Sequence, residues 1–421
     1  MRFSGYDAPR MTPRAGRGGG GARHLMTSED ACALLGVKRP TLYSYVSRGL
    51  IQVAHEPGVK RRLYVADDVR RVAARSAARR GHAPVAAGAL RWGEPVLDTS
   101  VSAVGEQGVF YRGHLVTSLV EQRVGFERVA DLLWQADDGE PWTVATAVPR
   151  LSAGRPLDRM LELAAWWSFR REAPDGAGAA GRGEARAWLG AAAAALVPGA
   201  ARGKGSLAAR LARALGLPAS ASEAIDAALV LTCDHELNAS TFAARIAAST
   251  GASLVACVGA ALYVFTGHRH GGACDRVADL IDELPVRPVT LATRLRERVA
   301  GGASLPGFGH HLYPDGDPRS APLLALSARH AVDLPALARM ERVADAVHTQ
   351  TGLRPSVDFA LVALVRSLAL PDAMAAGLFA LGRTAGWLAH AMEQRLEPAL
   401  LRPRARYVGP VPGSPSVPRL G

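Results

Sequence analysis

The sequence is poor in cysteine, and its four cysteines show neither C-x-x-C pairing nor dense spacing. This argues against a disulfide scaffold or a zinc ribbon and favours a reducing cytosol. The 44 glycines and 27 prolines follow no fixed period, which excludes collagen-like and repeat architectures. The amino terminus lacks the apolar core of a secretory signal. Residues 246–268 carry no charged side chain but are poor in leucine, so we expect a buried helix and no membrane span.

Apolar and charged residues occur in the proportions of a globular protein. Of the 421 residues, 48% are apolar and 21% are charged, which allows a sizeable core in two or three domains. The net charge of +12 is uneven, because residues 1–80 hold 16 Lys and Arg against 6 Asp and Glu, whereas the rest holds 34 against 32. A basic first fifth fits an anionic partner such as nucleic acid, or equally a solvated arginine-rich tail. Residues 1–24, rich in glycine and arginine, are expected to be disordered.

Residues 25–75 have the pattern of a small DNA-binding module. A capped helix that ends at Gly36 is followed by a second helix within residues 40–49. A short basic hairpin, or wing, at residues 53–64 precedes a third helix that begins at Asp67. This run of about fifty residues resembles the winged helix-turn-helix head of the MerR-type regulators.

In such a module the second helix enters the major groove of DNA and the wing contacts phosphates. The alternative is a small helical domain used for protein contact or oligomerisation. The residues expected to face DNA are Lys38, Arg39, Thr41, Tyr43 and Arg48 on the second helix, and Arg61 and Arg62 on the wing.

The rest of the chain is mostly helical in pattern. Residues 76–108 suggest a linker followed by a short strand pair, and from Val109 onward apolar residues recur at helical spacing almost throughout. Because β-signals are scarce, the body of the protein is expected to be all-α.

Four segments of the carboxyl half place polar residues inside apolar surroundings. Each is a glycine- or proline-containing turn beside a helix end, and each carries His, Asp or Arg. Loops on a rigid scaffold present reactive groups in this way. The segments are residues 232–240, 266–273, 306–319 and 355–359.

Together these segments resemble the citrate synthase family. DHELNASTFAARIAAST at residues 234–250 and LFALGRTAGWLAHAMEQ at residues 378–394 match the family's usual segments nearly letter for letter, and RPR at residues 402–404 fits its ending. Five motifs stand in the family's order, and the resemblance covers about residues 109–409.

The resemblance implies a reaction that joins acetyl-CoA to oxaloacetate and then hydrolyses the citryl thioester. Its difficult step is removal of a proton from the thioester methyl, which needs a positioned base and a donor for the developing enolate oxygen. By resemblance, Asp358 is the base and a neutral His270 donates to the thioester oxygen. His310 would polarise the oxaloacetate carbonyl and protonate the new alkoxide.

The resemblance also implies binding residues. Oxaloacetate is a dianion that suits bidentate arginines, and Arg319, Arg383 and His235 match the family's positions for it. Arg402 matches an arginine that reaches the neighbouring subunit's site, so we expect a homodimer or a larger assembly. No metal or cofactor is implied, because the CoA thioester is a substrate. The loop expected to cradle CoA by backbone contacts is Leu305, Pro306, Gly307, Phe308 and Gly309.

The sequence departs from the family beside the reacting groups. His268 and Arg269 replace the family's Pro-Leu, Cys274 replaces an asparagine, and His311 and Ser356 replace an arginine and an asparagine. None of these changes removes a reacting group, so they bear on rate and acyl-CoA choice. The side chains expected only to pack are Trp387, His390, Met392, Cys233, Cys257 and Cys274.

We therefore expect an all-α, two-domain citrate synthase fold preceded by a small winged helix-turn-helix domain. The large domain is expected at residues 109–271 plus 371–421, and the small domain at residues 272–370. The expected function is citrate synthesis in the tricarboxylic acid cycle, by a cytoplasmic protein. Two alternatives stay open: a catalytically weak ligand sensor that acts as a DNA-binding regulator, and a 2-methylcitrate synthase that uses propionyl-CoA. One methylene is worth only ~1–3 kcal/mol of discrimination, so the sequence leaves the acyl group undecided.

Overall fold

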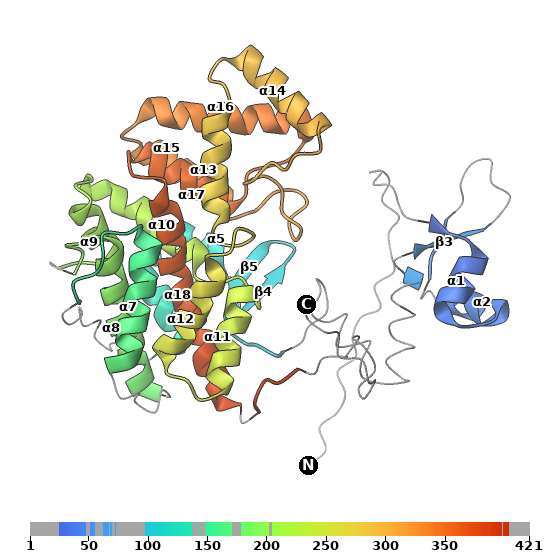
Figure 1. The fold of residues 1–421 in the computed structure, drawn as a ribbon, viewed down its shortest axis with the longest axis horizontal. Helices are drawn as coiled ribbons and strands as arrows, with labels where there is room; N and C mark the ends of the chain where they lie inside the picture. Colours follow the sequence, from blue (N-terminus) through green and yellow to red (C-terminus); the bar gives the residue numbers. More distant parts are fainter. Residues whose placement is uncertain are drawn as a thin grey trace, which may run out of the picture. The chain divides into compact units, whose positions relative to one another are not determined.

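A computed structural model gives the fold of the chain (Figure 1). The chain forms two compact units, Met1–Asp98 with Pro403–Gly421, and Thr99–Arg402. The residues that the structure describes are 25–47, 51–54, 62–66, 68–69, 72, 97–136, 142, 148–170, 178–201, 204–397 and 399–403.

The first unit contains two short helices and a three-stranded sheet. Its elements are β1 (Leu25–Met26), α1 (Ser28–Leu35), α2 (Arg39–Ser47), β2 (Val53–Ala54) and β3 (Leu63–Val65). The strands are antiparallel in the order β1-β3-β2, so β2 and β3 form the base of the expected hairpin. The hairpin tip, residues 55–61, lies outside the described residues.

Local sequence signals set the ends of α1. The Thr27 hydroxyl accepts a hydrogen bond from the backbone N–H of Asp30, a cap that stabilises a helix by about 1 kcal/mol. Gly36 ends the helix with φ 62°, the left-handed conformation that favours glycine. Beneath the helices lies a small core made of Ala31, Leu35, Leu42, Ile51, Tyr64, Val69 and Val72.

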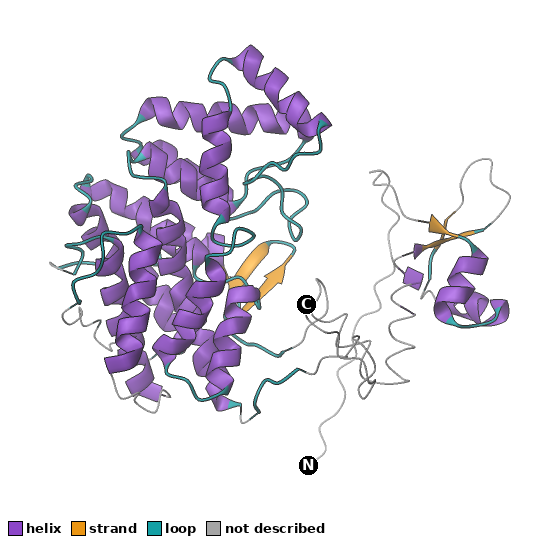
Figure 2. Ribbon diagram, in the orientation of Figure 1, coloured by secondary structure: helices purple, strands orange, loops and turns teal. Residues whose placement is uncertain are grey.

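The second unit is built almost entirely from helices, as the purple ribbon in Figure 2 shows. Its strands are β4 (Ser102–Gly105), β5 (Gly108–Tyr111) and β6 (His114–Leu115). Its helices are α5 (Val116–Glu121), α6 (Phe126–Trp134), α7 (Pro156–Arg170), α8 (Gly178–Leu196), α9 (Leu207–Ala214), the 3₁₀ turn η1 (Ala219–Ala221), α10 (Ser222–Thr232), α11 (Ala239–Ser249), α12 (Leu254–Phe265), α13 (Ala273–Glu283), α14 (Pro288–Ala300), α15 (Ser320–His330), α16 (Leu334–Thr351), α17 (Val357–Ser367) and α18 (Ala373–Leu396).

The small sheet of this unit includes residues that we expected to be helical. Its strands are antiparallel in sequence order, and Ser102 on β4 lies directly opposite Tyr111 on β5. The expectation of helix from Val109 onward was wrong for residues 109–115, because the first helix, α5, begins at Val116. Strands of four residues or fewer are too short to show the alternation that would distinguish them from a helix.

α18 is the central helix of the second unit. Its side chains are buried from Met374 to Ala391, and it packs against α6, α7, α8, α10, α11 and α12. In Figure 1 this red helix runs through the bundle beside α10 and α12. A helix with no exposed face of its own forms the core of the body, so the residues it carries are rigidly placed.

The uncharged stretch predicted to be a buried helix contains α12. This helix packs against α7, α11 and α18, and seven of its twelve residues are buried. Among the described residues, no helix combines the length and apolar character needed to cross a lipid bilayer.

Helices α13 to α17 form a second group at one end of the unit (Figure 1). α14 packs on α16, while α13, α15 and α16 pack on α17. α17 is buried over most of its length and also contacts α18, which connects the two groups. The boundaries proposed above for a large and a small domain stay a prediction.

Candidate active site

The turn between α10 and α11 is held close to α18 by two glycines. A Cβ on Gly386 would lie 2.3 Å from the carbonyl oxygen of Cys233, and one on Gly382 would lie 2.3 Å from Oγ1 of Thr232. Between these glycines, Arg383 donates from Nε to the carbonyl oxygen of Thr232 over 2.7 Å. Its two terminal nitrogens have no hydrogen-bond partner among the described residues, so they are available to a ligand.

His270 lies in the turn that follows α12. Gly271 packs so tightly on Phe265 that a Cβ there would lie 2.1 Å from the ring. This contact places the His270 ring on Phe265, with centroids 5.0 Å apart. Nε2 of His270 lies 2.7 Å from Oγ of Ser240, which also accepts a hydrogen bond from Nε1 of Trp387 over 3.0 Å.

The His270 imidazole is neutral at physiological pH. Burial, with a further contribution from the Arg383 charge, lowers the pKa of His270 to about 4. The single hydroxyl hydrogen of Ser240 has two acceptors, Oδ1 of Asn238 at 2.7 Å and Nε2 of His270. When this hydrogen points to Nε2 of His270, the single proton of the neutral ring is on Nδ1, and Nδ1 is then a hydrogen-bond donor.

His310 is fixed by its own loop. Its Nδ1 accepts a hydrogen bond from the backbone N–H of Leu312 over 3.2 Å, so a neutral ring carries its proton on Nε2. The His310 ring lies 4.8 Å from the ring of Tyr313 and 5.5 Å from that of His235. Burial, followed by the Arg319 charge, lowers the pKa values of His235 and His310, so both rings are neutral.

Arg319 is buried and paired with Asp317. Nε and Nη2 of Arg319 donate to Oδ1 and Oδ2 of Asp317 over 2.9 and 2.8 Å. The same carboxylate accepts from the backbone N–H of Val357 over 3.0 Å, which connects this loop to the start of α17. The outer edge of Arg319, formed by Nη1 and Nη2, keeps donors for a second carboxylate.

Asp358 lies in the first turn of α17, one residue after Val357, whose N–H bonds to Asp317. Oδ1 lies 3.6 Å from Sγ of Cys274, and Oδ2 lies 3.4 Å from Oγ of Ser356. Burial raises the pKa of Asp358, although the nearby Arg319 charge opposes this. Cys274 follows His270 by four residues, so it connects the aspartate to the turn that carries the histidine.

Two arginines join these groups into one electrostatic cluster. The charge of Arg383 acts on both His235 and His270. The charge of Arg319 acts on His235, His310 and Asp358. The structure therefore brings together the three residues predicted to be catalytic, His270, His310 and Asp358. Beside them lie the three residues predicted to bind oxaloacetate in the same chain, His235, Arg319 and Arg383.

The loop predicted to cradle CoA runs along the segment before α17. Gly309 donates to the carbonyl oxygen of Arg354 over 2.9 Å, and the carbonyl oxygen of Gly307 accepts from the N–H of Ser356 over 2.8 Å. Gly307 has φ 83°, and a Cβ there would lie 2.7 Å from Val277. Leu305–Gly309 is thus held rigidly beside Asp358, with these two backbone groups already occupied.

Arg402 lies away from the cluster within its own chain. The residue before it, Leu401, donates to Oγ of Ser249 at the carboxyl end of α11. Ser240, which contacts His270, lies at the opposite end of that helix, about 14 Å away at 1.5 Å per residue. Arg402 is exposed, so within this chain it does not join the other predicted residues.

Sequence reasoning missed the residues that orient the predicted ones. Trp387 and His390 do more than pack, since Trp387 bonds to Ser240 and His390 bonds to Asp234. Cys274, expected only to pack, contacts Asp358. Some signal was present, because the missed residues Ser240, Tyr313 and Asp317 all stand inside the polar segments singled out above.

In the first unit, most of the residues predicted to face DNA are exposed. The exposed ones are Lys38, Arg39, Thr41 and Tyr43 around α2, and Arg62 before β3. Arg48 and Arg61 lie outside the described residues.

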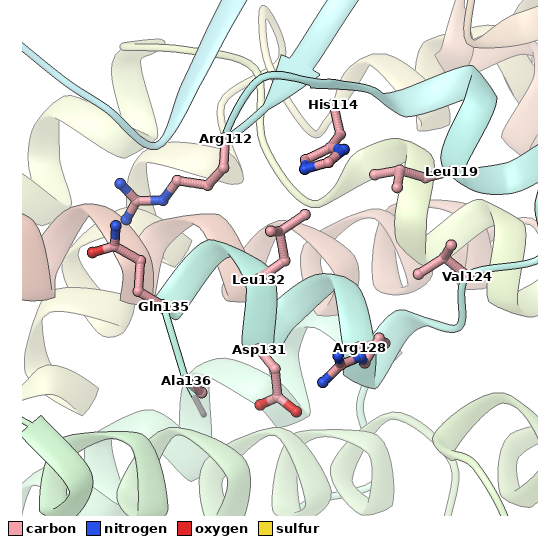
Figure 3. Close-up of a pocket in the computed structure, with 9 residues that line it drawn as sticks. All are labelled: Arg112, His114, Leu119, Val124, Arg128, Asp131, Leu132, Gln135 and Ala136. Carbon is pink, nitrogen blue, oxygen red and sulfur yellow. The ribbon is translucent and has the colours of Figure 1, made fainter. Parts of the chain in front are cut away.

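A separate hollow of about 380 Å³ lies between the β5–β6 turn and α6 (Figure 3). None of the predicted site residues line it. Its Arg112 donates to the carbonyl oxygen of Leu133, and its Asp131 pairs with Arg186. These charged groups support the fold, and we assign the hollow no function.

Two families match the chain. The family described as "Citrate synthase, C-terminal domain" matches residues 183–404, and the one described as "Helix-turn-helix domain" matches residues 25–76. The second match is coarser than the MerR-type head inferred from the sequence.

Several curated proteins are similar to this chain. "Putative citrate synthase 2" of Mycobacterium tuberculosis (strain ATCC 25618 / H37Rv) is 39% identical over 207 residues, which cover 46% of this chain and 53% of that protein. "Citrate synthase 2" of Bacillus subtilis (strain 168) is 35% identical, with 45% and 51% covered. "2-methylcitrate synthase" of Shewanella oneidensis is also 35% identical, with 45% and 52% covered. The chain thus spans about half the length of the curated relatives it matches.

Solved structures share the fold. The citrate synthase of Thermotoga maritima has a TM-score of 0.66 at 23% identity, covering 77% of this chain and 96% of that one. The citrate synthase of Thermoplasma acidophilum, solved as a ternary complex with carboxymethyl coenzyme A and oxaloacetate, has a TM-score of 0.68 at 22% identity, with the same coverage. Since the matched family segment covers more than half of the sequence, the chain belongs to the citrate synthase family and carries a helix-turn-helix domain at its amino-terminal end.

Proposed function

We propose that the second unit condenses acetyl-CoA with oxaloacetate to give citrate and CoA. One observation carries this proposal: three neutral histidines and a carboxyl of raised pKa surround two buried arginines. Neutral imidazoles donate hydrogen bonds without adding charge, and a carboxylate of raised pKa is a stronger base than an ordinary one. Buried guanidinium groups recognise carboxylates.

The first step is removal of a proton from the acetyl methyl. Asp358 takes this proton, and the electron pair of the C–H bond moves toward the thioester oxygen. Nδ1–H of His270 donates to that oxygen, provided that Ser240 donates to Nε2. The burial that raises the Asp358 pKa therefore favours proton transfer near neutral pH.

The second step forms the carbon–carbon bond. The enolate carbon attacks the ketone carbon of oxaloacetate, and the alkoxide that forms takes the Nε2 proton of His310. The proton held by Asp358 then returns to His310 by way of solvent, so both residues regain their starting states. Arg319, Arg383 and His235 hold the substrate carboxylates. Water then cleaves the citryl thioester, giving citrate and the CoA thiol.

The test is release of CoA thiol from acetyl-CoA with and without oxaloacetate. The full chain should release thiol only when both substrates are present. Asp358→Asn should lower turnover by at least ~10²-fold while oxaloacetate binding persists in calorimetry. Asp345→Asn, on the exposed face of α16, is the matched control and should behave as the parent. Near-normal turnover in Asp358→Asn would mean that the base is misassigned.

The same assay separates acyl-CoA substrates. One of the similar proteins is named a 2-methylcitrate synthase, which makes propionyl-CoA the second substrate to test. We propose acetyl-CoA as the preferred substrate. A higher kcat/KM with propionyl-CoA would reverse this assignment.

We also propose that the first unit binds DNA as a MerR-like winged helix-turn-helix. Exposed Lys38 and Arg39 at the start of α2, and Arg62 beside the hairpin, support phosphate contacts. If the full chain binds DNA and oxaloacetate but shows no turnover, the protein is a ligand-sensing regulator and the enzymatic proposal fails.

Assembly and location complete the proposal. We propose a homodimer or larger assembly, since Arg402 is exposed and outside its own chain's cluster, as expected of a residue that acts in a neighbouring subunit. All four cysteines are free thiols, which supports a cytoplasmic location. The proposed condensation is the reaction that would give the protein a place in the tricarboxylic acid cycle. Light scattering at several protein concentrations tests the assembly.

A further inference from the structure

A serine on the small sheet bonds to both neighbours of His235. Oγ of Ser102 donates to Oδ2 of Asp234 and accepts from the backbone N–H of Glu236 over 3.1 Å. Glu236 has φ 55°, a left-handed conformation that a residue other than glycine keeps only when its surroundings enforce it. One hydroxyl group therefore fixes the turn on both sides of the histidine.

The partner of Ser102 across the sheet reaches the same turn. Tyr111 lies directly opposite Ser102, and opposed residues of antiparallel strands project from the same face of a sheet. The Tyr111 hydroxyl accepts from the backbone N–H of Asp234 over 3.1 Å and lies within hydrogen-bond distance of the carbonyl oxygens of Val230 and Asp234. The hairpin thus holds both the backbone and the carboxylate of Asp234.

On its other side, Asp234 is bonded to α18. Nε2 of His390 lies 3.1 Å from Oδ2 of Asp234, and both side chains are fully buried. An aspartate and a histidine buried together are costly to the fold unless each has a specific partner. Burial lowers the pKa of Arg383, and the Asp234 carboxylate is the strongest influence that opposes it. The Asp234 carboxylate therefore favours the charged form of Arg383, whose Nε also bonds to the same turn at the carbonyl oxygen of Thr232.

Glu393 faces the far side of His390, at a distance too long for a hydrogen bond. Nδ1 of His390 lies 4.0 Å from Oε2 of Glu393, which itself accepts hydrogen bonds from Oγ1 of Thr99 and from Nη1 of Arg245. The backbone N–H of Ser100 donates to the other oxygen of Glu393 over 2.8 Å. The segment that leads into β4 is thus anchored next to the histidine.

We propose that Ser102 and Tyr111, acting through Asp234 and His390, are positioning residues that fix His235 and Arg383 for a small dicarboxylate substrate. None of the four touches the reacting atoms. Ser102 and Tyr111 also lie outside the segment that matches the citrate synthase family, residues 183–404. The substrate site therefore depends on a hairpin that the family match does not cover. This inference rests on the proposed function, because its readout is oxaloacetate binding.

The test compares variants that differ by single polar groups. Ser102→Ala and Tyr111→Phe remove one hydroxyl each with little change of shape. His390→Gln keeps a neutral nitrogen donor for Asp234, whereas His390→Leu removes it. Ser327→Ala is the matched control, because the Ser327 hydroxyl is buried but bonds only to the carbonyl oxygen of Leu323 in its own helix. Each variant is measured for thermal unfolding, oxaloacetate Kd by calorimetry, and kcat and KM for both substrates.

Ser102→Ala and Tyr111→Phe should each raise the oxaloacetate Kd and KM by about tenfold or more, the effect of losing a hydrogen bond in a charged network. The KM for acetyl-CoA should stay within about twofold, since no CoA-binding group is displaced. His390→Leu should resemble them, and His390→Gln and Ser327→Ala should remain close to the parent.

Specific outcomes would overturn the inference. The inference is refuted if Ser102→Ala or Tyr111→Phe folds and binds oxaloacetate with the same Kd as the parent. Equal losses for both substrates, or equal losses in Ser327→Ala, would reduce the network to a purely structural one. If Ser102→Ala does not fold, the His390→Gln and His390→Leu pair decides, and equal oxaloacetate Kd values in that pair refute the proposal. If the parent itself neither binds oxaloacetate nor releases thiol, the proposed function fails first, and this inference fails with it.

Discussion

Replacing Asp317 by asparagine should destabilise the second unit and weaken oxaloacetate binding together. Oδ1 of Asp317 accepts from N and Nε of Arg319 over 3.1 and 2.9 Å. Oδ2 accepts from Nη2 of Arg319 and from the N–H of Val357 over 2.8 and 3.0 Å. The asparagine keeps one acceptor oxygen, but its amide group then faces two donors, and the buried Arg319 loses its counter-charge.

The expected cost follows from these contacts. Removing one partner of a buried ion pair costs about 3–5 kcal/mol, because the other charge remains buried and uncompensated. That is a large share of the roughly 5–15 kcal/mol by which a typical domain is stable. Since Arg319 also loses its fixed orientation, we expect the oxaloacetate Kd to rise at least tenfold, or ~1.4 kcal/mol.

The effect should depend on pH in a defined direction. Burial alone would raise the pKa of Asp317, but the charge of Arg319 and its hydrogen bonds outweigh this, so the pKa is lowered. A carboxyl whose pKa is lower in the folded state stabilises the fold above its unfolded pKa of about 3.9, and this is lost as the pH falls through the folded value. The difference between the parent and Asp317→Asn should therefore be largest near neutral pH and shrink in acid.

Urea unfolding followed by circular dichroism, at about pH 7 and at several acidic values, measures this difference. Asp345→Asn, with an exposed carboxylate, is the control and should match the parent at every pH. A difference below about 1 kcal/mol at neutral pH, or one that does not change with pH, would show that the Asp317–Arg319 pair does not have the energetic role assigned to it.

Three further predictions follow from single contacts. Burial raises the pKa of Asp358, and the hydrogen bond from the Cys274 thiol opposes part of this rise. Cys274→Ala should therefore move the acidic limb of the kcat–pH profile to higher pH, and an unchanged limb would exclude the contact in solution. Gly386→Ala should cost about 1–3 kcal/mol of unfolding free energy and weaken oxaloacetate binding, because its Cβ would lie 2.3 Å from the carbonyl oxygen of Cys233; calorimetry and urea unfolding check this. Arg62→Ala should reduce by about one the slope of log affinity for DNA against log salt, measured by mobility shift, whereas an unchanged slope would place Arg62 away from phosphate.

The sequence predicted the parts of the molecule that depend on local signals. The Gly36 helix end and the pairing of β2 with β3 follow from residues close together in the chain, and the structure contains both. The clustering of His270, His310 and Asp358 was also predicted, because each lies in a motif whose family pattern implies its neighbours. In that case the resemblance supplied what periodicity could not.

The network around Asp234 was not predictable by the same reasoning. Ser102 is 132 residues from Asp234 in the sequence, and His390 is 156 residues away on the other side. Residues so far apart in the sequence form no local pattern that would reveal their contact, and the strand that carries Ser102 is only four residues long. A histidine on an otherwise apolar helix such as α18 looks like a packing residue until its carboxylate partner is known.

The charges in the cluster indicate how the proposed dianionic substrate would be recognised. Asp317 forms an ion pair with Arg319, and the Asp234 carboxylate partly offsets the burial that lowers the pKa of Arg383. Each keeps the outer edge of its guanidinium group, a geometry that matches a carboxylate. Recognition therefore depends on fixed donors more than on net charge, and the neutral histidines add donors of the same kind. In the proposed reaction, a bound dianion would raise the pKa of Asp358 further by like-charge repulsion, which would strengthen the base when the methyl proton must be removed.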